Sequence, residues 1–238
     1  MTFVPLLVFL APLLICSNAQ AKPKDCTDIL KTYRYSRSGV FGIYPFDDRF
    51  RVLVYCDMET DRGAWTMIQR RMDGTVNFCR PWDQYVSGFG KAYGEYWLGL
   101  EFIHKITNRS KQELLVEMED FDGNKAFAKY SSFSVGPECQ GYKMNVSGFI
   151  NGGAGNSLTV HNGMKFTTLD KDQDIYKYGN CAKRGYGGWW YASCHHANPN
   201  GIYLWGSAAP YYAGINWSTW KGLSYSLKSI SFKIRPAK

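Results

Sequence analysis

The sequence lacks the features that mark a membrane-spanning or nucleic-acid-binding protein. Beyond residue 21, no apolar run approaches the ~20 residues that a transmembrane helix needs. The 28 lysines and arginines outnumber the 20 acidic residues and give a net charge of +8, but they are scattered and never form a run of five. We therefore expect no nucleic-acid partner, and a weak attraction to acidic glycans is the more sensible role for the excess charge.

The usual motifs of enzymes and of elongated stalks are also missing. There is no Cys-x-x-Cys pair, no Gly-x-Ser-x-Gly nucleophile elbow, no Gly-x-y collagen tract and no heptad run. No nucleophile–base pair can be assembled from the sequence either. With 45% apolar and 16% aromatic residues the protein is not disordered. These absences predict a folded, non-enzymatic protein.

The first residues resemble a secretion signal. Residues 1–21 carry no charged side chain, have an apolar core, and end in an Ala-x-Ala arrangement formed by Ala19 and Ala21. Cleavage could fall before Gln20 or before Lys22, and we take the second position. We therefore expect a secreted protein whose mature part, residues 22–238, is one domain, because no linker-like composition interrupts it.

The cysteines favour disulfides over metal clusters. One of the seven, Cys16, lies in the predicted leader, and an exported protein with an even number of cysteines is typically disulfide-bonded. Six cysteines allow fifteen pairings, so the sequence alone does not fix the connectivity. The natural pairs along the sequence are Cys26–Cys56 and Cys181–Cys194, which leaves Cys79–Cys139 by elimination.

The two halves of the sequence differ in their hydrophobic patterning. Strand-like alternation and one helix-like segment occur in the first half. Residues 148–222 are instead crowded with glycines and aromatics and show little periodicity, and long irregular segments are often functional when they are ordered. We expect the functional site there. The predicted strands are 41–44, 51–55, 65–69, 113–120 and 127–133, and the predicted helix is 93–105.

An acidic run in the second half is a candidate calcium site. Asp170, Asp172 and Asp174 occupy alternate positions, and carboxylate oxygens are the ligands that calcium prefers. The run is not an EF-hand, because Ile175 and Cys181 stand where that loop needs glycine and glutamate. By spacing alone, a calcium loop and a solvated acidic turn are equally good interpretations.

A histidine pair directly after Cys194 invites two interpretations. A zinc or catalytic role for His195 and His196 would require further His or Cys ligands, and the cysteines are better assigned to disulfides. A structural or ligand-lining histidine is therefore the preferred interpretation. The surrounding tyrosines and tryptophans can form core and a shallow aromatic pocket of the kind that binds sugars and acyl groups.

Three Asn-x-Ser/Thr sequons are possible glycosylation sites. Asn108 lies in a polar turn and is the best acceptor, and Asn145 is a second one. Asn216 stands between aromatic residues, which favours burial over modification.

Several strings resemble one known family, the fibrinogen-related (fibrinogen C-terminal) domains, which include ficolins and tachylectins. The resemblance covers residues 25–238 and implies an α+β fold, a single fibrinogen C-terminal-like globular domain with a loop-rich C-terminal calcium- and ligand-binding part. The strings that carry it are Tyr55-Cys56-Asp57-Met58, Gly94-Glu95-Tyr96-Trp97-Leu98-Gly99-Leu100, Gly188-Trp189-Trp190-Tyr191, Cys194-His195, Asn198-Pro199-Asn200-Gly201 and Lys233-Ile234-Arg235-Pro236.

The resemblance also implies particular site residues. A Ca²⁺ ion would be held by Asp172 and Asp174 with the backbone carbonyls of Tyr176 and Tyr178, and Asp170 would lie outside this set. An acetyl-binding pocket beside the calcium loop would follow a cis Ser193–Cys194 peptide. A pocket tyrosine of the family falls at Gly185 here, so Tyr186 is expected to replace it. The expected ligand-binding residues are His195, Tyr211, the backbone around Cys194, and Tyr186.

These residues predict a secreted, calcium-dependent, lectin-like protein that binds acetylated carbohydrates or microbial surface glycans in innate defence. A single site of this kind binds weakly, so useful binding needs several copies and we expect a homo-oligomer. The alternative is a protein of the extracellular matrix or its microfibrils that binds collagen- or elastin-type fibres.

Overall fold

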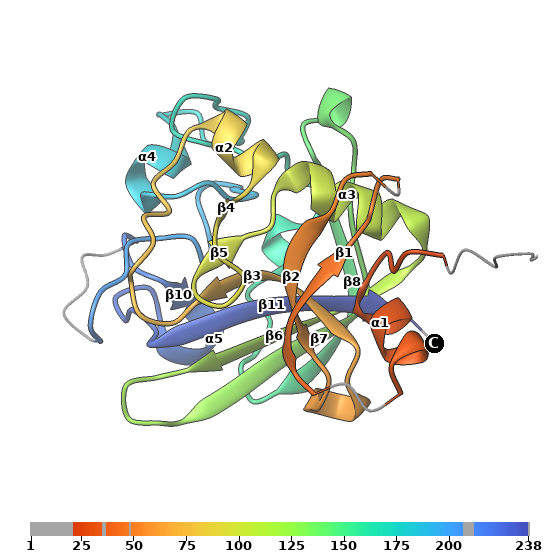
Figure 1. Ribbon diagram of the computed structural model, residues 1–238. Coiled ribbons are helices and arrows are strands. Elements are labelled where there is room, and N and C mark those ends of the chain that lie inside the picture. Colours follow the sequence, from red (N-terminus) through yellow and green to blue (C-terminus); the bar gives the residue numbers. More distant parts are fainter. Residues whose placement is uncertain (1–20, 35–36, 48, 207–211, 238) are drawn as a thin grey trace, which may run out of the picture.

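A long antiparallel sheet crosses the molecule, and most of the helices and loops lie above it in the view of Figure 1. The computed structural model describes residues 21–34, 37–47, 49–206 and 212–237, so nearly all of the predicted leader lies outside the described residues. Within them the main sheet has nine strands, in the order β1-β2-β3-β11-β6-β7-β8 with β4 and β5 paired beside β3. The strands of this sheet are β1 (Gly39–Ile43), β2 (Val52–Asp57), β3 (Trp65–Arg71), β4 (Phe89–Gly90), β5 (Tyr96–Trp97), β6 (Gln112–Glu119), β7 (Lys125–Val135), β8 (Met144–Gly152) and β11 (Ser229–Pro236).

The remaining elements are short, and most belong to the layer above the sheet. The predicted α+β fold is therefore confirmed. No helix among the described residues is long and apolar enough to cross a membrane. The helices are α1 (Cys26–Thr32), α2 (Trp82–Ser87), α3 (Leu100–Arg109), α4 (Cys181–Gly185) and α5 (Ser218–Lys221), with 3₁₀ turns η1 (Thr60–Arg62), η2 (Glu138–Gln140) and η3 (Thr159–His161) and a small second sheet of β9 (Ala197–Asn198) and β10 (Asn216–Trp217).

The predicted strand over residues 113–120 is confirmed as β6. Leu114, Val116 and Met118 are buried against the core, because alternate side chains of a strand point to the same face. On the opposite face, Glu113 pairs with Arg235 of the neighbouring β11, with 2.5 Å between carboxylate and guanidinium atoms. The last strand, β11, thus runs between β3 and β6 and ties the two halves of the sheet together (Figure 1).

The predicted helix over 93–105 was placed too early, since α3 begins only at Leu100. The preceding residues form β5, which pairs with β3 and β4. Gly99 separates the two elements with φ +108°, a conformation that favours glycine and interrupts a helix. The helix then docks on β7 through His104, whose Nδ1 is 2.8 Å from the carbonyl oxygen of Val135.

An aromatic cluster joins the sheet to the loops above it. Tyr85 of α2 lies 5.6 Å from Trp97 of β5, and Phe166 lies 5.1 Å from Trp190, measured between ring centroids. Trp97 and Phe166 are themselves 5.6 Å apart, so the rings form one continuous core. Edge-to-face ring pairs of this kind add stability beyond the area that they bury.

Two of the three predicted disulfides are present. Cys26–Cys56 joins α1 to β2, and Cys181–Cys194 closes the loop after α4. The predicted Cys79–Cys139 pair is wrong, because both thiols are free and exposed. Pairing by elimination assumes that every cysteine is bonded, and Cys79 and Cys139, in the loop before α2 and in the turn η2, do not meet that assumption.

Candidate functional site

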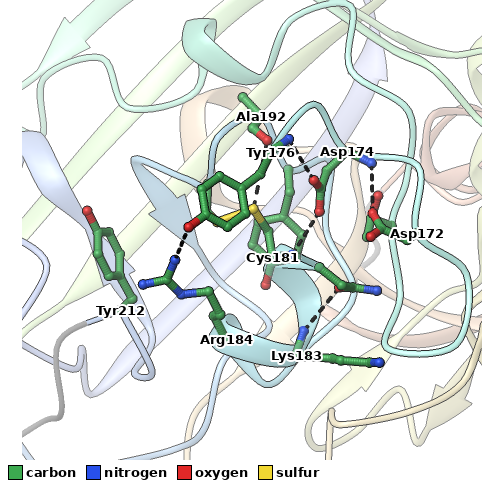
Figure 2. The surroundings of a disulfide bond; sticks show 12 residues. Asp172, Asp174, Tyr176, Cys181, Lys183, Arg184, Ala192 and Tyr212 are labelled. Atoms are coloured by element: carbon green, nitrogen blue, oxygen red, sulfur yellow. Dashed lines mark hydrogen bonds between the residues drawn. A yellow bond between two sulfur atoms is a disulfide. The ribbon is translucent and has the colours of Figure 1, made fainter. Parts of the chain in front are cut away.

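The acidic run forms a turn that is closed by its own carboxylates. Asp174 accepts hydrogen bonds from the amides of Tyr176 (2.9 Å) and Cys181 (2.8 Å), and Asp172 accepts one from the amide of Asp174 at 3.3 Å (Figure 2). Burial and the negative charge of Asp172 raise the pKa of Asp174. The two carboxylates are thus held together at an electrostatic cost that a bound cation would offset.

Asp170 has a different role from the two aspartates that follow it. Its carboxylate accepts hydrogen bonds from the Thr168 hydroxyl at 2.7 Å and from the amide of Trp82 at 2.9 Å. Burial disfavours its charge, but these hydrogen bonds outweigh burial and lower the pKa of Asp170. Asp170 therefore anchors the loop to the start of α2, in keeping with the expectation that it lies outside a calcium ligand set.

The donor set predicted for calcium consists of oxygen atoms only, as calcium prefers. It contains the carboxylates of Asp172 and Asp174 and the carbonyls of Tyr176 and Tyr178. Here and elsewhere among the described residues, no three or more His, Cys, Asp or Glu side chains gather as metal ligands. The adjacent carboxylates fit a calcium ion, and the complete set stays a prediction.

The disulfide fixes the segment that follows the acidic turn. Asn180 caps α4 by accepting a hydrogen bond from the amide of Lys183 at 3.2 Å, and Cys181 then begins the helix. Its bridge to Cys194 holds the Cα atoms 5.4 Å apart. The Ser193–Cys194 peptide is cis, as the family resemblance predicted. The acidic turn, α4 and the histidine pair are thereby brought together.

His195 is a buried residue packed against aromatic rings. Its side chain lies between the rings of Tyr191 and Tyr212, whose centroids are 5.6 Å and 5.2 Å away. The residue is 4% exposed, and neither ring nitrogen has a hydrogen-bond partner among the described residues. Burial, together with nearby positive groups, lowers the pKa of His195 to about 3, so the ring is neutral at pH 7. A neutral imidazole keeps one donor and one acceptor.

His161, which the sequence analysis did not identify, is also buried but differs from His195 in its hydrogen bonding. Its Nδ1 lies 2.8 Å from the carbonyl oxygen of Trp190, and its Nε2 accepts hydrogen bonds from the amides of His196 and Ala197 at 3.2 Å each. Burial lowers its pKa to about 4. His161 thus supports the segment around His195 with both nitrogens engaged, whereas His195 has both available.

Asn198 is a second supporting residue, and the sequence indicated it only as part of a family string. Its amide nitrogen donates to the carbonyls of Gly185 (2.9 Å) and Gly214 (3.2 Å), and its oxygen accepts from the Tyr191 hydroxyl at 2.8 Å. A Cβ atom on Gly185 would stand 2.3 Å from that same hydroxyl oxygen. The close approach of Tyr191 therefore explains why glycine occupies position 185.

The predicted ligand-binding residues are only partly brought together. Cys194 and His195 lie at the centre, and Tyr212 provides the ring that faces His195. Tyr211 lies outside the described residues. Tyr186 is 46% exposed and lines a separate hollow of about 200 Å³, so the structure does not place it against His195.

The three sequons are in different environments. Asn108 is exposed at the end of α3, and Asn145 is exposed on the edge strand β8. Asn216 is fully buried and donates a hydrogen bond to the carbonyl of Gly214 at 3.2 Å. The expectation that Asn216 is inaccessible agrees with this burial, and modification of Asn108 and Asn145 stays a prediction.

Comparison with known proteins identifies clear relatives. The family model described as fibrinogen beta and gamma chains, C-terminal globular domain, matches residues 22–237. Microfibril-associated glycoprotein 4 from Bos taurus is 51% identical over 220 residues, which are 90% of this chain and 86% of that protein. The fibrinogen-like globe domain of human ANGPTL2 is 45% identical and has a TM-score of 0.86, covering 91% of this chain and 100% of that domain. A lamprey fibrin D-dimer complexed with the peptide Gly-His-Arg-Pro-amide is 34% identical with a TM-score of 0.85, covering 92% of this chain and 75% of the matched one.

Proposed function

Because the chain belongs to the family of fibrinogen C-terminal globular domains, we propose that it is a secreted, non-enzymatic recognition protein for acetyl-bearing ligands. The observation that carries this proposal is His195, a buried imidazole whose two nitrogens have no hydrogen-bond partner among the described residues. Buried polar groups are nearly always hydrogen-bonded, and an orphan pair in a site suggests a missing partner. The relatives named above are glycoproteins or fibrinogen-like domains, and none of their names denotes an enzyme.

The chemistry of an acetamido group suits this position. A neutral His195 offers one donor and one acceptor, and an acetamide offers one carbonyl acceptor and one N–H donor. The methyl group would pack against the rings of Tyr191 and Tyr212, which flank His195. The backbone around Cys194 would complete the contact. Tyr211, which lies outside the described residues, and Tyr186 stay expected ligand contacts.

Calcium would act on the loop and not on the sugar. Asp172 and Asp174 would hold it with the carbonyls of Tyr176 and Tyr178, and the ion would supply positive charge that relieves the repulsion between the carboxylates. The hydrogen bond from the amide of Cys181 to Asp174 then connects the calcium turn to the disulfide beside His195. Ligand binding would depend on calcium because calcium stabilises this loop.

The proposal is tested with acetylated and non-acetylated serum albumin as immobilised ligands, in calcium and in EDTA. We expect binding to the acetylated form only, loss of binding in EDTA, and competition by free N-acetylglucosamine. Since one site is weak, on the order of millimolar, binding to the dense surface should exceed binding to the free sugar if the protein is a homo-oligomer. Equal binding to both albumins in calcium would contradict the proposal.

A second candidate function is binding to extracellular-matrix fibres, and the name of the relative from Bos taurus favours it. The two functions can be separated with one variant. His195→Phe keeps a buried aromatic ring but removes both nitrogens. Matrix-fibre binding that survives this substitution and is not competed by N-acetylglucosamine would assign matrix binding to another surface of the molecule.

A further inference from the structure

We propose that Cys79 of one copy and Cys139 of a second copy form an intermolecular disulfide, so that the protein assembles covalently with itself. Both thiols are unpaired and exposed, whereas three of the four cysteines in the two disulfides of the structure are fully buried. In a secreted protein, a cysteine left without a partner suggests a bond to another chain or a reactive thiol. This assembly is independent of acetyl binding.

Cys139 is presented by a rigid hairpin loop. The connection between β7 and β8 contains the turn η2, and it is the short green coil at the top of the view in Figure 1. Backbone hydrogen bonds close this loop: the amide of Gly136 donates to the carbonyl of Lys143 at 2.8 Å, and the amide of Gly141 donates to the carbonyl of Glu138 at 2.7 Å. Glu138 and Cys139 are both exposed. The loop therefore offers its thiol to another molecule without any unfolding.

Cys79 lies beside a hollow that can receive such a loop. The volume of the hollow is about 200 Å³. Sites for small molecules usually have about 300–1,000 Å³, so a side chain from a partner fits this hollow better than a whole ligand does. Tyr186 and Ile202 are exposed large side chains that line the hollow, and they would pack against the loop. Besides Cys79, the lining includes Arg71, Phe78, Tyr186, Ile202 and Tyr203.

The two surfaces are complementary in charge. Arg80 follows Cys79 directly, and its guanidinium group pairs with no carboxylate within the described part of the protein. It donates instead to neutral oxygen atoms of Asn77 and Gln84, at 2.8 Å each. No acidic residue among the described ones lines the hollow. Residues 136–142, by contrast, contain Glu138 and no basic residue. Opposite charges of this kind steer two surfaces together and fix their register.

A contact between the loop of one copy and the hollow of the next uses two different surfaces. Each copy has one of each, so the contact is heterologous and either closes into a ring or repeats along a chain of copies. Several binding sites would then be displayed together, which is what weak single sites need for useful binding.

The bond requires an oxidant, and a small-molecule disulfide such as oxidised glutathione supplies it. The thiolate of one cysteine attacks the glutathione disulfide, which gives a mixed disulfide and releases one glutathione thiolate. The thiolate of the second copy attacks the protein sulfur of the mixed disulfide and releases the other glutathione. Two protein thiols are thereby oxidised and one glutathione disulfide is reduced, and the two thiol protons end on the two glutathione molecules.

The test compares the unmodified protein with Cys79→Ser, Cys139→Ser and the double variant. Each is treated briefly with reduced glutathione, transferred to oxidised glutathione, and analysed by electrophoresis without reductant after the remaining thiols are blocked. The unmodified protein should form dimers or larger species that reductant removes, and each single variant should stay monomeric. A mixture of the two single variants should give a dimer and nothing larger, because one variant keeps the loop thiol and the other keeps the thiol of the hollow.

The double variant is the control for folding. It should stay monomeric and keep the melting temperature of the unmodified protein, because both substituted positions are exposed.

The charge of Glu138 gives a separate test of the contact. Glu138→Gln keeps a side-chain oxygen that can accept from the indole nitrogen of Trp82, 3.3 Å away, but removes the charge. The rate of dimer formation at low salt should fall about two- to fivefold, and the difference should vanish in about 0.5 M sodium chloride. Asp122→Asn, an exposed carboxylate in the turn after β6, is the matched control and should leave the rate unchanged.

Three outcomes would overturn the proposed bond. A single variant that still forms dimers would show that like cysteines cross-link without this contact. An unmodified protein that stays monomeric would show that the thiols remain free or pair within one chain. An equal rate of dimer formation at low salt in Glu138→Gln and the unmodified protein would show that the loop does not approach this hollow. Acetyl binding is measured separately, so none of these outcomes decides the proposed function.

Discussion

The sheet and the loop region above it, residues 153–228, are held together in different ways. In the sheet, backbone groups of adjacent strands pair with each other, and cross-strand ion pairs such as Glu113–Arg235 cover the outer face. In the loop region, many backbone groups form hydrogen bonds with buried side chains instead. His161 binds the backbone of Trp190 and of residues 196–197, and Asn198 binds two glycine carbonyls.

This difference has consequences for stability. A strand can lose one side chain and keep its backbone ladder. A loop that depends on one buried amide loses several backbone partners at once, because each unpaired buried group has its own desolvation cost. The same arrangement explains how a region with little periodicity stays ordered enough to hold His195 in place.

The largest effect that we expect in the loop region is from Asn198→Ala. The side chain is fully buried, and its loss leaves the carbonyls of Gly185 and Gly214 and the Tyr191 hydroxyl without this partner. Urea unfolding should show a loss of about 3–5 kcal/mol, as large as that of Leu114→Ala in the sheet. Gln140→Ala, at an exposed position, should cost less than about 0.5 kcal/mol. A loss below about 1 kcal/mol for Asn198→Ala would contradict the comparison.

Removing either disulfide should cost a similar free energy of unfolding, but the two removals should differ in their effect on the response to calcium. Each closes a loop, with sequence separations of 13 for Cys181–Cys194 and 30 for Cys26–Cys56, and each should contribute about 3–4 kcal/mol on the chain-entropy model. Replacing both cysteines of a pair by serine measures this by thermal unfolding. Only the loss of Cys181–Cys194 should also weaken the response to calcium. An equal calcium response in both double variants would refute the assignment of that response to the loop region.

Calcium should stabilise the protein by mass action, by about 2.7 kcal/mol at a concentration one hundred times the dissociation constant. Differential scanning calorimetry in calcium and in EDTA measures the rise in melting temperature. Asp172→Ala should abolish the rise, and Asp122→Ala, an exposed aspartate in the turn after β6, should preserve it. An unchanged rise in Asp172→Ala would show that the ligand assignment is wrong.

As the pH falls, titratable groups of the loop region should lose their contribution to folding stability at a higher pH than those of the sheet. The pKa of His195 is about 3 in the folded protein and about 6.5 in the unfolded one. Between these values the unfolded state binds more protons, so the stability present above pH 6.5 is lost as the pH falls. At pH 5 this loss is about 2 kcal/mol, and His195→Phe should remove that part of it in EDTA. Burial disfavours the charge of Asp57, but its hydrogen bonds to Lys233 and Thr60 outweigh burial and lower its pKa to about 2. The contribution of Asp57 to stability is therefore lost only below about pH 3.8.

The variant His195→Phe should therefore reduce the slope of the stability profile between pH 7 and pH 5 by about half, because His161, with its pKa of about 4, still titrates in that interval. Asp57→Asn should leave the interval unchanged. Chemical unfolding at each pH checks both. A profile that is equally steep in His195→Phe and in the unmodified protein would contradict the assignment of this pH dependence to the loop region.

The hydrophobic pattern of the sequence predicted the strands of the sheet better than the structure of the loops. Alternation within β6 is a local property, and it located that strand to within a residue. The helix α3 was placed too early because pairing with β3, which is not visible in the local pattern, makes Tyr96 and Trp97 a strand, and Gly99 then precedes the first helical residue, Leu100.

The loop region depends on contacts between distant residues, which periodicity does not record. Gln69 of β3 donates to the carbonyl of Pro199, 130 positions away, and no local pattern predicts that bond. His195 was found through the family resemblance and the position after Cys194. His161 was missed because its importance lies in hydrogen-bond partners that only the fold reveals. The Cys79–Cys139 pair was predicted wrongly because pairing by elimination uses no geometric information.

The most direct test of the central claim follows the two buried histidines by NMR. The imidazole signals of His195 and His161 are recorded in calcium during titration with N-acetylglucosamine. Because both nitrogens of His195 lack a partner among the described residues and both nitrogens of His161 are engaged, the His195 signals should shift with the sugar concentration while those of His161 stay in place. A titration in which the sugar binds without moving the His195 signals would contradict the claim that this residue is the centre of the site.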